Sequence, residues 1–239
     1  MSFKSKFNKY ARKIAKVITY FDDEGSGKDP LLDILRRLDQ KAPIIFDVGA
    51  NIGQSVKNLK RYFPYGKIYS FEPSANAYKE LEKVSSQYKN VEPYQIALGS
   101  QETQMKIYEN SSSDMNSFLK MGKNGSGSII GESVVEVTTI DQFCARNNIQ
   151  KIHILKIDAQ GYDFEVIKGA KEMILANKIE LLYFEIIFSE MYKGVPRFSE
   201  IYDFLIDHGF SLVSLYDFHY QKNLAGWTDG LFIHQSAIR

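Results

Sequence analysis

The sequence predicts an α/β fold in which a parallel β-sheet carries helices on both faces. From Pro43 onward, strand-like and helix-like segments alternate, an order typical of parallel sheets with crossover helices. An apolar run that starts at Ile44 ends in a glycine turn, after which Gln54 begins a helical pattern. A later run, Ile152–Ile157, is almost continuously apolar, which indicates a strand buried on both faces.

Length and composition limit the class of protein. The chain has 239 residues, enough for one large domain, which we expect at residues 43–239 after an N-terminal extension at 1–42. Hydrophobic residues at 44% and charged residues at 25% exclude disordered and fibrous classes. The net charge of +1 predicts no general affinity for nucleic acid. The sequence shows no secretory signal and no apolar run long enough for a membrane span, so we expect a cytoplasmic enzyme.

The extension is predicted to hold two helices joined by a polar linker. Over Phe3–Tyr20, apolar residues recur at helical spacing among basic residues with no acid, so this segment is a basic amphipathic helix. It could make weak contact with an anionic membrane surface, although packing on the domain with the lysines in solvent is favoured. A second helix is expected over Leu31–Leu38, with Pro30 in its first turn. The two helices together could serve as a homodimer contact.

The alternation after Pro43 predicts the remaining elements. Thr139 can cap a helix that carries the single cysteine, Cys144, as a small buried residue. A Ser-, Gly- and Asn-rich stretch at 110–131 separates two alternating strands, and such a loop is substrate-facing or disordered. Helices are expected at residues 54–62, 75–87, 140–147, 164–176 and 199–208. Further strands are expected at residues 67–71, 91–98, 105–108, 134–138, 152–157, 179–187, 210–216 and 230–234, with the last two antiparallel.

The turn between Gly49 and Gly53 predicts a nucleotide-like ligand. Its glycines allow close approach of the backbone, and the following helix N-terminus leaves amides free. Glu72 follows the next strand, where an acid can bind the two ribose hydroxyls. The glycine spacing is not Gly-x-Gly-x-x-Gly, and Asp47 would repel a pyrophosphate, which argues against an NAD-dependent oxidoreductase. The same carboxylate suits the sulfonium and ammonium charges of S-adenosylmethionine.

Several segments spread along the chain share the pattern of one known family. They are Phe46–Gly53, Phe71–Pro73, Val137–Asp141, Leu155–Asp163 and Lys168–Ala170. Together they resemble the FkbM-type S-adenosylmethionine-dependent O-methyltransferases over most of the chain. The first two segments occur in many class I methyltransferases, whereas the others are more specific. The chain departs from the family pattern at Gln160, where many members carry an acid, and at Asp163.

The resemblance implies a fold, a cofactor and a reaction. The fold is a Rossmann-like, seven-stranded, mostly parallel sheet with an antiparallel last strand. The two alternating strands at residues 105–108 and 134–138 add an expected β-hairpin insertion to it. The reaction is methyl transfer from S-adenosylmethionine to a hydroxyl, often of a sugar, so the expected acceptor is a sugar, a glycan or a glycosylated metabolite. Ala97 is expected to flank the adenine, and Asp158 to lie near the reactive methyl group. The other expected cofactor-binding residues are Asp47, Gly49, Ala50, Asn51, Gly53 and Glu72.

Asp158 and Glu185 are the expected polar pair at the reaction centre, because each ends a strand at the same rim of the sheet. Among the histidines, His153 lies in an apolar strand and is expected in the core, whereas His219 lies on a loop and is the plausible base. Asp158, Asp163 and Glu185 could instead hold a divalent metal, but no adjacent pair of acids follows either strand, so metal independence is favoured.

The alternative to an enzyme is a catalytically silent scaffold that kept the fold and binds a nucleotide or S-adenosylmethionine. The basic extension and Gln160 are the two features that favour this alternative.

Overall fold

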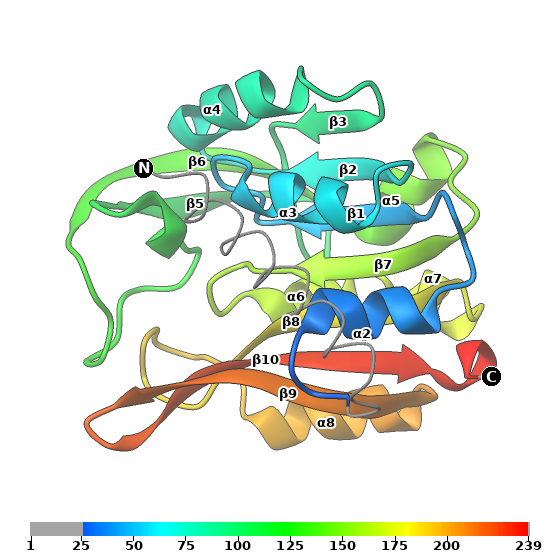
Figure 1. Cartoon of the computed structure of the whole chain (residues 1–239). Coiled ribbons are helices and arrows are strands. Elements are labelled where there is room, and N and C mark those ends of the chain that lie inside the picture. Colours follow the sequence, from blue (N-terminus) through cyan, green and yellow to red (C-terminus); the bar gives the residue numbers. More distant parts are fainter. Residues whose placement is uncertain (1–25, 239) are drawn as a thin grey trace, which may run out of the picture.

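The computed structural model describes residues 26–238 (Figure 1). The basic helix expected over Phe3–Tyr20 lies outside the described residues. The division of the chain at residue 43 stays a prediction, and so does a dimer contact through the extension.

Within the described residues, seven strands form one sheet in the order β3-β2-β1-β7-β8-β10-β9. The first five of these strands are parallel, and β10 runs antiparallel to both β8 and β9, as predicted. The order reverses between β1 and β7, and ligands bind at such switch points, beyond the carboxyl ends of the strands. The strands are β1 (Ile44–Val48), β2 (Lys67–Phe71), β3 (Val91–Tyr94), β7 (Ile152–Ile157), β8 (Ile179–Ile187), β9 (Phe210–Gln221) and β10 (Leu224–His234).

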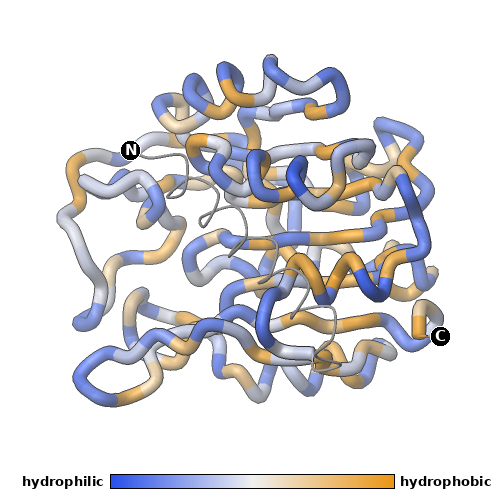
Figure 2. The backbone as a smooth tube through the Cα atoms, in the orientation of Figure 1, coloured by the Kyte–Doolittle hydropathy of each residue, from blue (hydrophilic) through white to orange (hydrophobic). Residues whose placement is uncertain are grey.

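Helices cover both faces of this sheet (Figure 1). Because side chains alternate along a strand, Ile154 packs toward one helix layer and Leu155 toward the other. In Figure 2 the hydrophobic colour runs along β7, the strand buried by both layers. One layer contains α2 (Pro30–Arg37), α3 (Gln54–Tyr62) and α4 (Ala75–Ser85). The other contains α5 (Ile140–Arg146), α6 (Asp163–Lys168), α7 (Lys171–Leu175) and α8 (Phe198–Asp207).

The predicted hairpin insertion is confirmed, and the end of the third predicted strand pairs with this hairpin instead of the main sheet. β5 (Thr103–Asn110) and β6 (Ile129–Thr138) pair antiparallel, and β4 (Ala97–Leu98) joins β6 in a second sheet. The single strand expected over residues 91–98 is therefore wrong. Phe71, the last residue of β2, pairs with Tyr94, so the chain beyond Tyr94 has no partner in the main sheet and pairs with β6 instead.

The helix expected over residues 164–176 is also divided in two. The Asp141 carboxylate accepts hydrogen bonds from the amides of Glu172 and Met173 and so starts α7 as a new helix. At the break, a Cβ on Gly169 would meet the carbonyl oxygen of Gly99 at 2.0 Å, so only glycine allows this approach. The cap of α5 is as predicted, with Thr139 accepting from the Gln142 amide and Cys144 only 3% exposed.

The last two strands are longer than predicted. β9 continues to Gln221 and β10 begins at Leu224, joined by Lys222 and Asn223, both with positive φ. That pair of backbone angles gives the tight turn that matches the twist of a hairpin. His219 therefore lies on a strand, and its expected place on a loop is wrong.

No helix in the described part of the chain is both long enough and apolar enough to cross a bilayer.

Candidate active site

A cavity of about 500 Å³ lies at the carboxyl ends of β1, β2 and β7. Its volume is within the usual range for a small-molecule site. Several residues predicted from the sequence line it, namely Gly49, Ala50, Asn51, Glu72, Ala97 and Asp158. Four other predicted site residues do not line it, namely Asp47, Gly53, Glu185 and His219.

The glycine turn forms the floor of the cavity, and contacts with the ends of β2 and β7 hold its backbone in place. The amides of Gly49 and Ala50 each donate to the carbonyl of Phe71 at 3.0 Å. Gly49 has φ +72°, and a Cβ there would meet the Asp158 carbonyl oxygen at 1.8 Å. Glycine at position 49 therefore lets the turn lie directly against the end of β7.

Glu72 ties the second strand to the turn. Its carboxylate accepts hydrogen bonds from the Asn51 amide at 3.0 Å and the Ser74 amide at 2.8 Å. Burial raises the pKa of Glu72 to about 7, against the opposing effect of these amides. Both oxygens keep a free lone pair, so the carboxylate can accept further hydrogen bonds from a pair of hydroxyls in the cavity.

Asp47 lies beneath the turn and is paired with a cation. It is fully buried, accepts a 2.6 Å hydrogen bond from Ser55 Oγ, and its Oδ1 lies 3.1 Å from Lys156 Nζ. Although burial opposes it, the charges of Asp47 and Asp158 raise the pKa of Lys156 above its usual value. Sequence reasoning missed Lys156, which lines the cavity; the available signal was a lysine inside an otherwise apolar strand.

Asp158 presents an accessible carboxylate at the end of β7. Its side chain is 45% exposed and lines the cavity, and its Oδ2 lies 3.9 Å from Lys156 Nζ. Asp163 fixes the turn that follows, because its carboxylate accepts from the amides of Ala159 and Gly161. Burial, and then the charge of Asp158, raise the pKa of Asp163 to about 7. The site thus brings the glycine turn, the buried Glu72 carboxylate and the exposed Asp158 carboxylate together in one cavity.

A family model described as the methyltransferase FkbM domain matches residues 47–212, which include all of these features. This protein belongs to the FkbM methyltransferase family. The resemblance seen in the sequence is therefore confirmed.

Two curated relatives of this FkbM methyltransferase have names that specify a reaction. The 2-O-methyltransferase NoeI of Sinorhizobium fredii is 22% identical over 72% of this chain and 74% of its own length. The hexuronic acid methyltransferase AglP of Haloferax volcanii is 26% identical over 68% of this chain and 63% of its own length.

Solved structures share the fold. A methyltransferase FkbM from Methylobacillus flagellatus matches with a TM-score of 0.50 and 15% identity, over 81% of this chain and 44% of that one. The magnesium protoporphyrin IX methyltransferase of Synechocystis PCC 6803, solved with bound S-adenosylmethionine, matches with a TM-score of 0.51 and 10% identity, over 85% and 76%. The Rossmann-like methyltransferase fold of this chain is therefore shown.

Glu185 in this FkbM methyltransferase is buried beside the cavity, where it does not contribute to the wall. Burial raises its pKa to about 9, and the charges of Asp158, Asp163 and Asp229 add to the effect. Its Oε2 is buried and has no hydrogen-bond partner in the part of the chain that the structure describes. Burial thus favours the protonated form of Glu185, which is a weaker proton acceptor than an ionised carboxylate.

Neither His219 nor His153 lines the cavity, and each contacts neighbouring residues elsewhere. The His219 ring stacks on Trp227 with 4.6 Å between centroids, outside the cavity wall. His153 is buried, and its Nδ1 accepts from the Ile44 amide at 2.9 Å, so its expected place in the core is confirmed. Among the described residues, no cluster of three or more His, Cys, Asp or Glu could hold a metal ion.

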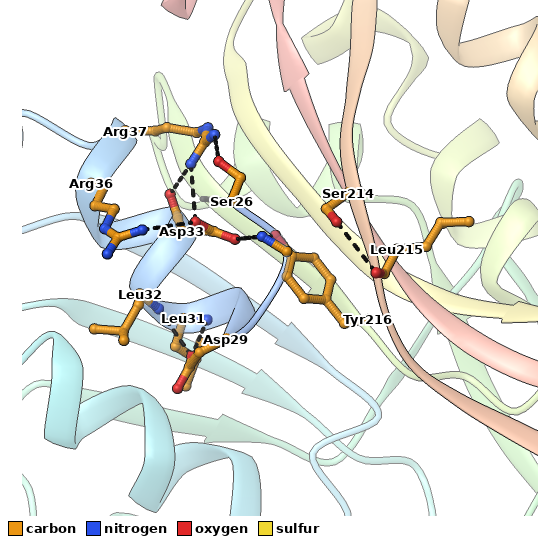
Figure 3. Close-up of polar contacts among 11 residues, drawn as sticks. Ser26, Asp29, Leu31, Leu32, Asp33, Arg36, Arg37, Ser214, Leu215 and Tyr216 are labelled. Atoms are coloured by element: carbon orange, nitrogen blue, oxygen red, sulfur yellow. Dashed lines mark hydrogen bonds and ion pairs between the residues drawn. The ribbon is translucent and has the colours of Figure 1, made fainter. Parts of the chain in front are cut away.

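The start of α2 forms a wall that sequence reasoning did not anticipate. Lys28, Asp29 and Leu31 line the cavity, and Ile34 is fully buried against α3 and the sheet. Asp33 anchors this segment (Figure 3). Its carboxylate accepts from the Gly27 amide at 2.7 Å and from the hydroxyl of Tyr216, on β9, at 2.8 Å, and Arg36 and Arg37 lie within 3.6 Å.

The insertion supplies another wall of this methyltransferase. Residues 113, 114 and 116–118 of the Ser- and Asn-rich stretch line the cavity. Ser117 Oγ donates to the Gln160 carbonyl at 2.7 Å, so this segment is attached to the turn that carries Asp158. Tyr183, Asp217 and Asp229 complete the wall beside β8 and the hairpin of β9 and β10.

Proposed function

We propose that this protein is an S-adenosylmethionine-dependent O-methyltransferase whose acceptor is a hydroxyl of a sugar, a glycan or a glycosylated metabolite. The observation that carries the proposal is the half-exposed Asp158 carboxylate, which opens into the same cavity as the glycine turn and Glu72. NoeI and AglP, named for a 2-O position and for a hexuronic acid, support a sugar acceptor.

The residues of the cavity fit S-adenosylmethionine. Asn51 lines the cavity, and its buried side-chain Oδ1 has no hydrogen-bond partner among residues 26–238, so it is available to a donor on a ligand. Glu72 would hold the ribose hydroxyls, and Ala97 and Leu98 offer apolar surface for the adenine. Gly49 and Ala50 would bring backbone close to the methionine part.

When bound, S-adenosylmethionine supplies an electrophilic methyl group, which a hydroxyl oxygen takes up as the carbon–sulfur bond breaks and leaves its electron pair on sulfur. The protein contributes mainly alignment of the acceptor in this reaction, since an in-line displacement depends on the relative placement of the reacting atoms. Tyr183, Asp217 and Asp229 line the cavity and can hydrogen-bond to acceptor hydroxyls.

Asp158 would accept the proton that the hydroxyl loses. A sugar hydroxyl is a poor nucleophile until its proton has an acceptor, and a positioned base contributes about 10²–10⁴-fold in rate. Among the described residues, Oδ2 of Asp158 has no partner nearer than Lys156 Nζ at 3.9 Å, which leaves it accessible to a hydroxyl. Glu185 does not line the cavity and its burial favours the protonated form, so Asp158 rather than Glu185 is proposed as the base.

Calorimetry with S-adenosylmethionine and a release assay for S-adenosylhomocysteine test the proposal together. Free hexoses, hexuronic acids and oligosaccharides serve as the acceptor panel. Asp158→Asn should keep cofactor affinity within about twofold and lose about 100-fold or more in turnover. Asp203→Asn, on an exposed position of α8, is the matched control and should behave as wild type.

Absence of cofactor binding at millimolar concentration would rule out the proposal. Binding without turnover on any acceptor would instead favour the catalytically silent scaffold.

A further inference from the structure

A chain of hydrogen bonds leads from a buried tyrosine to the Asp158 carboxylate. The hydroxyl of Tyr192 donates to Gln160 Oε1 at 2.6 Å, and Gln160 Nε2 donates to Asp158 Oδ1 at 2.6 Å. Tyr192 is 2% exposed and lies on the segment between β8 and α8. Three side chains from two separate segments are thus connected in series.

The donor and acceptor groups of the three side chains determine which group donates in each of the two hydrogen bonds. An ionised carboxylate can only accept, so Gln160 must turn its NH₂ toward Asp158. The amide oxygen is then left for Tyr192, whose hydroxyl can donate to it. A glutamate at position 160 would instead place a second carboxyl group against Asp158, and the two groups would have to share a proton.

The backbone at Gln160 is held from two sides. Its φ of +51° is uncommon for a residue with a side chain, and such angles persist where surrounding contacts fix them. Ser117 Oγ donates to the Gln160 carbonyl at 2.7 Å, while the Asp163 carboxylate holds the amides on either side of it. The Gln160 side chain therefore leaves the backbone in a fixed direction.

Tyr192 is held by the insertion. It forms an isolated bridge with Met121, and the amide of the next residue, Lys193, donates to the Lys120 carbonyl at 2.8 Å. Its ring lies against Gly161, where an added Cβ would meet it at 3.2 Å. Packing with Ile187 and Met191 completes its burial.

We propose that Gln160 and Tyr192 are positioning residues, which aim the Asp158 carboxylate into the cavity and keep it an acceptor for the hydroxyl proton. This inference rests on the proposed function of Asp158. It assigns a role to a glutamine that stands where many family members carry an acid, and to a tyrosine outside the motifs.

Several other groups set the electrostatic surroundings of Asp158, and none of them is changed by substitution at position 160 or 192. They are Lys156 on β7, Asp163 on α6, Glu72 after β2, Tyr183 and Glu185 on β8, and Asp229 on β10. Differences between variants therefore report on the hydrogen-bond chain.

Carboxyl ¹³C NMR titration of the full-length protein without acceptor tests the inference. Asp158→Asn identifies the Asp158 resonance by its loss. In Gln160→Glu the titration midpoint should move up by about one to two pH units, because two carboxylates in contact share a proton. In Tyr192→Phe it should move up by less, because the freed amide can turn its oxygen toward Asp158. Tyr162→Phe is the matched control, since the one hydrogen bond of that hydroxyl within the described part of the chain is to the sulfur of Met105, and no shift is expected.

Kinetics give a second readout with any acceptor found in the sugar panel. Tyr192→Phe should lower kcat about tenfold, the factor that one hydrogen bond is worth, with unchanged cofactor affinity. In Gln160→Glu the acid side of the pH–rate profile should move up, so that activity recovers at higher pH. A merely structural role would lower activity at every pH and leave the profile in place.

An unchanged midpoint in folded Gln160→Glu, or an equal shift in Tyr192→Phe and Tyr162→Phe, would overturn the inference. A wild type that methylates no hydroxyl would defeat the proposed function alone, because the NMR titration needs no turnover.

Discussion

Lys156 and Asp47 show how a buried charge is held at the residue scale. They face each other in register on β7 and β1, with Asp47 fully buried and the Lys156 side chain 12% exposed. Lys156→Met should destabilise the fold by about 3–5 kcal/mol, because it leaves an uncompensated carboxylate in the core. Urea denaturation followed by circular dichroism measures the change.

The double variant Lys156→Met with Asp47→Asn is the control for this ion pair. Removing both charges should recover most of the stability, since the penalty comes from the unpaired charge. A double variant no more stable than the single one would contradict the pairing.

Glu72 should make cofactor binding depend on pH. Burial raises its pKa to about 7, so the carboxyl gains charge as pH rises from 6 to 8. An ionised carboxylate accepts more strongly than a carboxyl, so S-adenosylmethionine affinity should rise about fivefold over that range. Calorimetry at pH 6, 7 and 8 measures it, and Glu72→Gln should flatten the profile and lower affinity at pH 8.

The stability of the free protein should change in the opposite sense. Between about pH 4.5 and 7 the folded state keeps the Glu72 proton that the unfolded chain has lost, so the contribution of Glu72 to folding stability falls as pH rises.

Glu80→Gln, on the exposed surface of α4, is the control for the binding prediction and should keep the wild-type dependence of cofactor affinity on pH. A flat wild-type profile would argue against Glu72 as a ligand-binding carboxylate.

The motif spacing predicted several of the residues that line the cavity, but it was less successful in predicting the contacts that each residue makes. Gly49, Asn51, Glu72 and Asp158 do line one cavity, and their roles stay predictions. Asp47 was expected to face the cationic cofactor, yet Lys156 lies next to it. The sequence pattern cannot predict this ion pair, because the lysine lies on a neighbouring strand more than a hundred positions away.

At the scale of elements, α2 is attached to the sheet by one buried acid. Tyr216→Phe removes the donor that β9 offers to Asp33, so Asp33 loses part of its hydrogen bonding in the core. We expect a loss of about 1–2 kcal/mol in unfolding free energy and faster proteolysis at residues 26–29. Limited proteolysis with mass spectrometry locates the cleavage.

Tyr220→Phe is the matched control for the α2 anchor, since Tyr220 also lies on β9 but is 68% exposed. It should keep wild-type stability and protection. Equal effects of the two substitutions would mean that Asp33 does not hold α2 in place.

Local periodicity predicted most elements, and the exceptions have long-range causes. The strand expected at residues 91–98 breaks because β2 ends at Phe71 and β6 offers a new partner. The helix expected at 164–176 breaks because Asp141, from another helix, caps α7. The hairpin of β9 and β10 is longer because Lys222 and Asn223 adopt positive φ, which the sequence permits without requiring.

At the scale of the molecule, alternation and the family motifs predicted the sheet and its topology, which place the cavity at the switch point between β1 and β7. The other walls of the cavity come from the start of α2, from the insertion and from the β9–β10 hairpin. Of these, the sequence indicated only the loop at residues 110–131, because the three segments are far apart in the sequence and meet only through tertiary packing. A membrane contact of the basic N-terminal helix, a homodimer, a cytoplasmic location and the absence of nucleic-acid binding all stay predictions.

The proposed function requires this cavity to deliver a methyl group to oxygen. Incubation with S-adenosylmethionine labelled with ¹³C in the methyl group, followed by NMR of the sugar products, tests it most directly. We predict one labelled methyl ether at one hydroxyl, one equivalent of S-adenosylhomocysteine per ether, and loss of both in Asp158→Asn. Label found on carbon or nitrogen, or full methyl transfer by folded Asp158→Asn, would contradict the account.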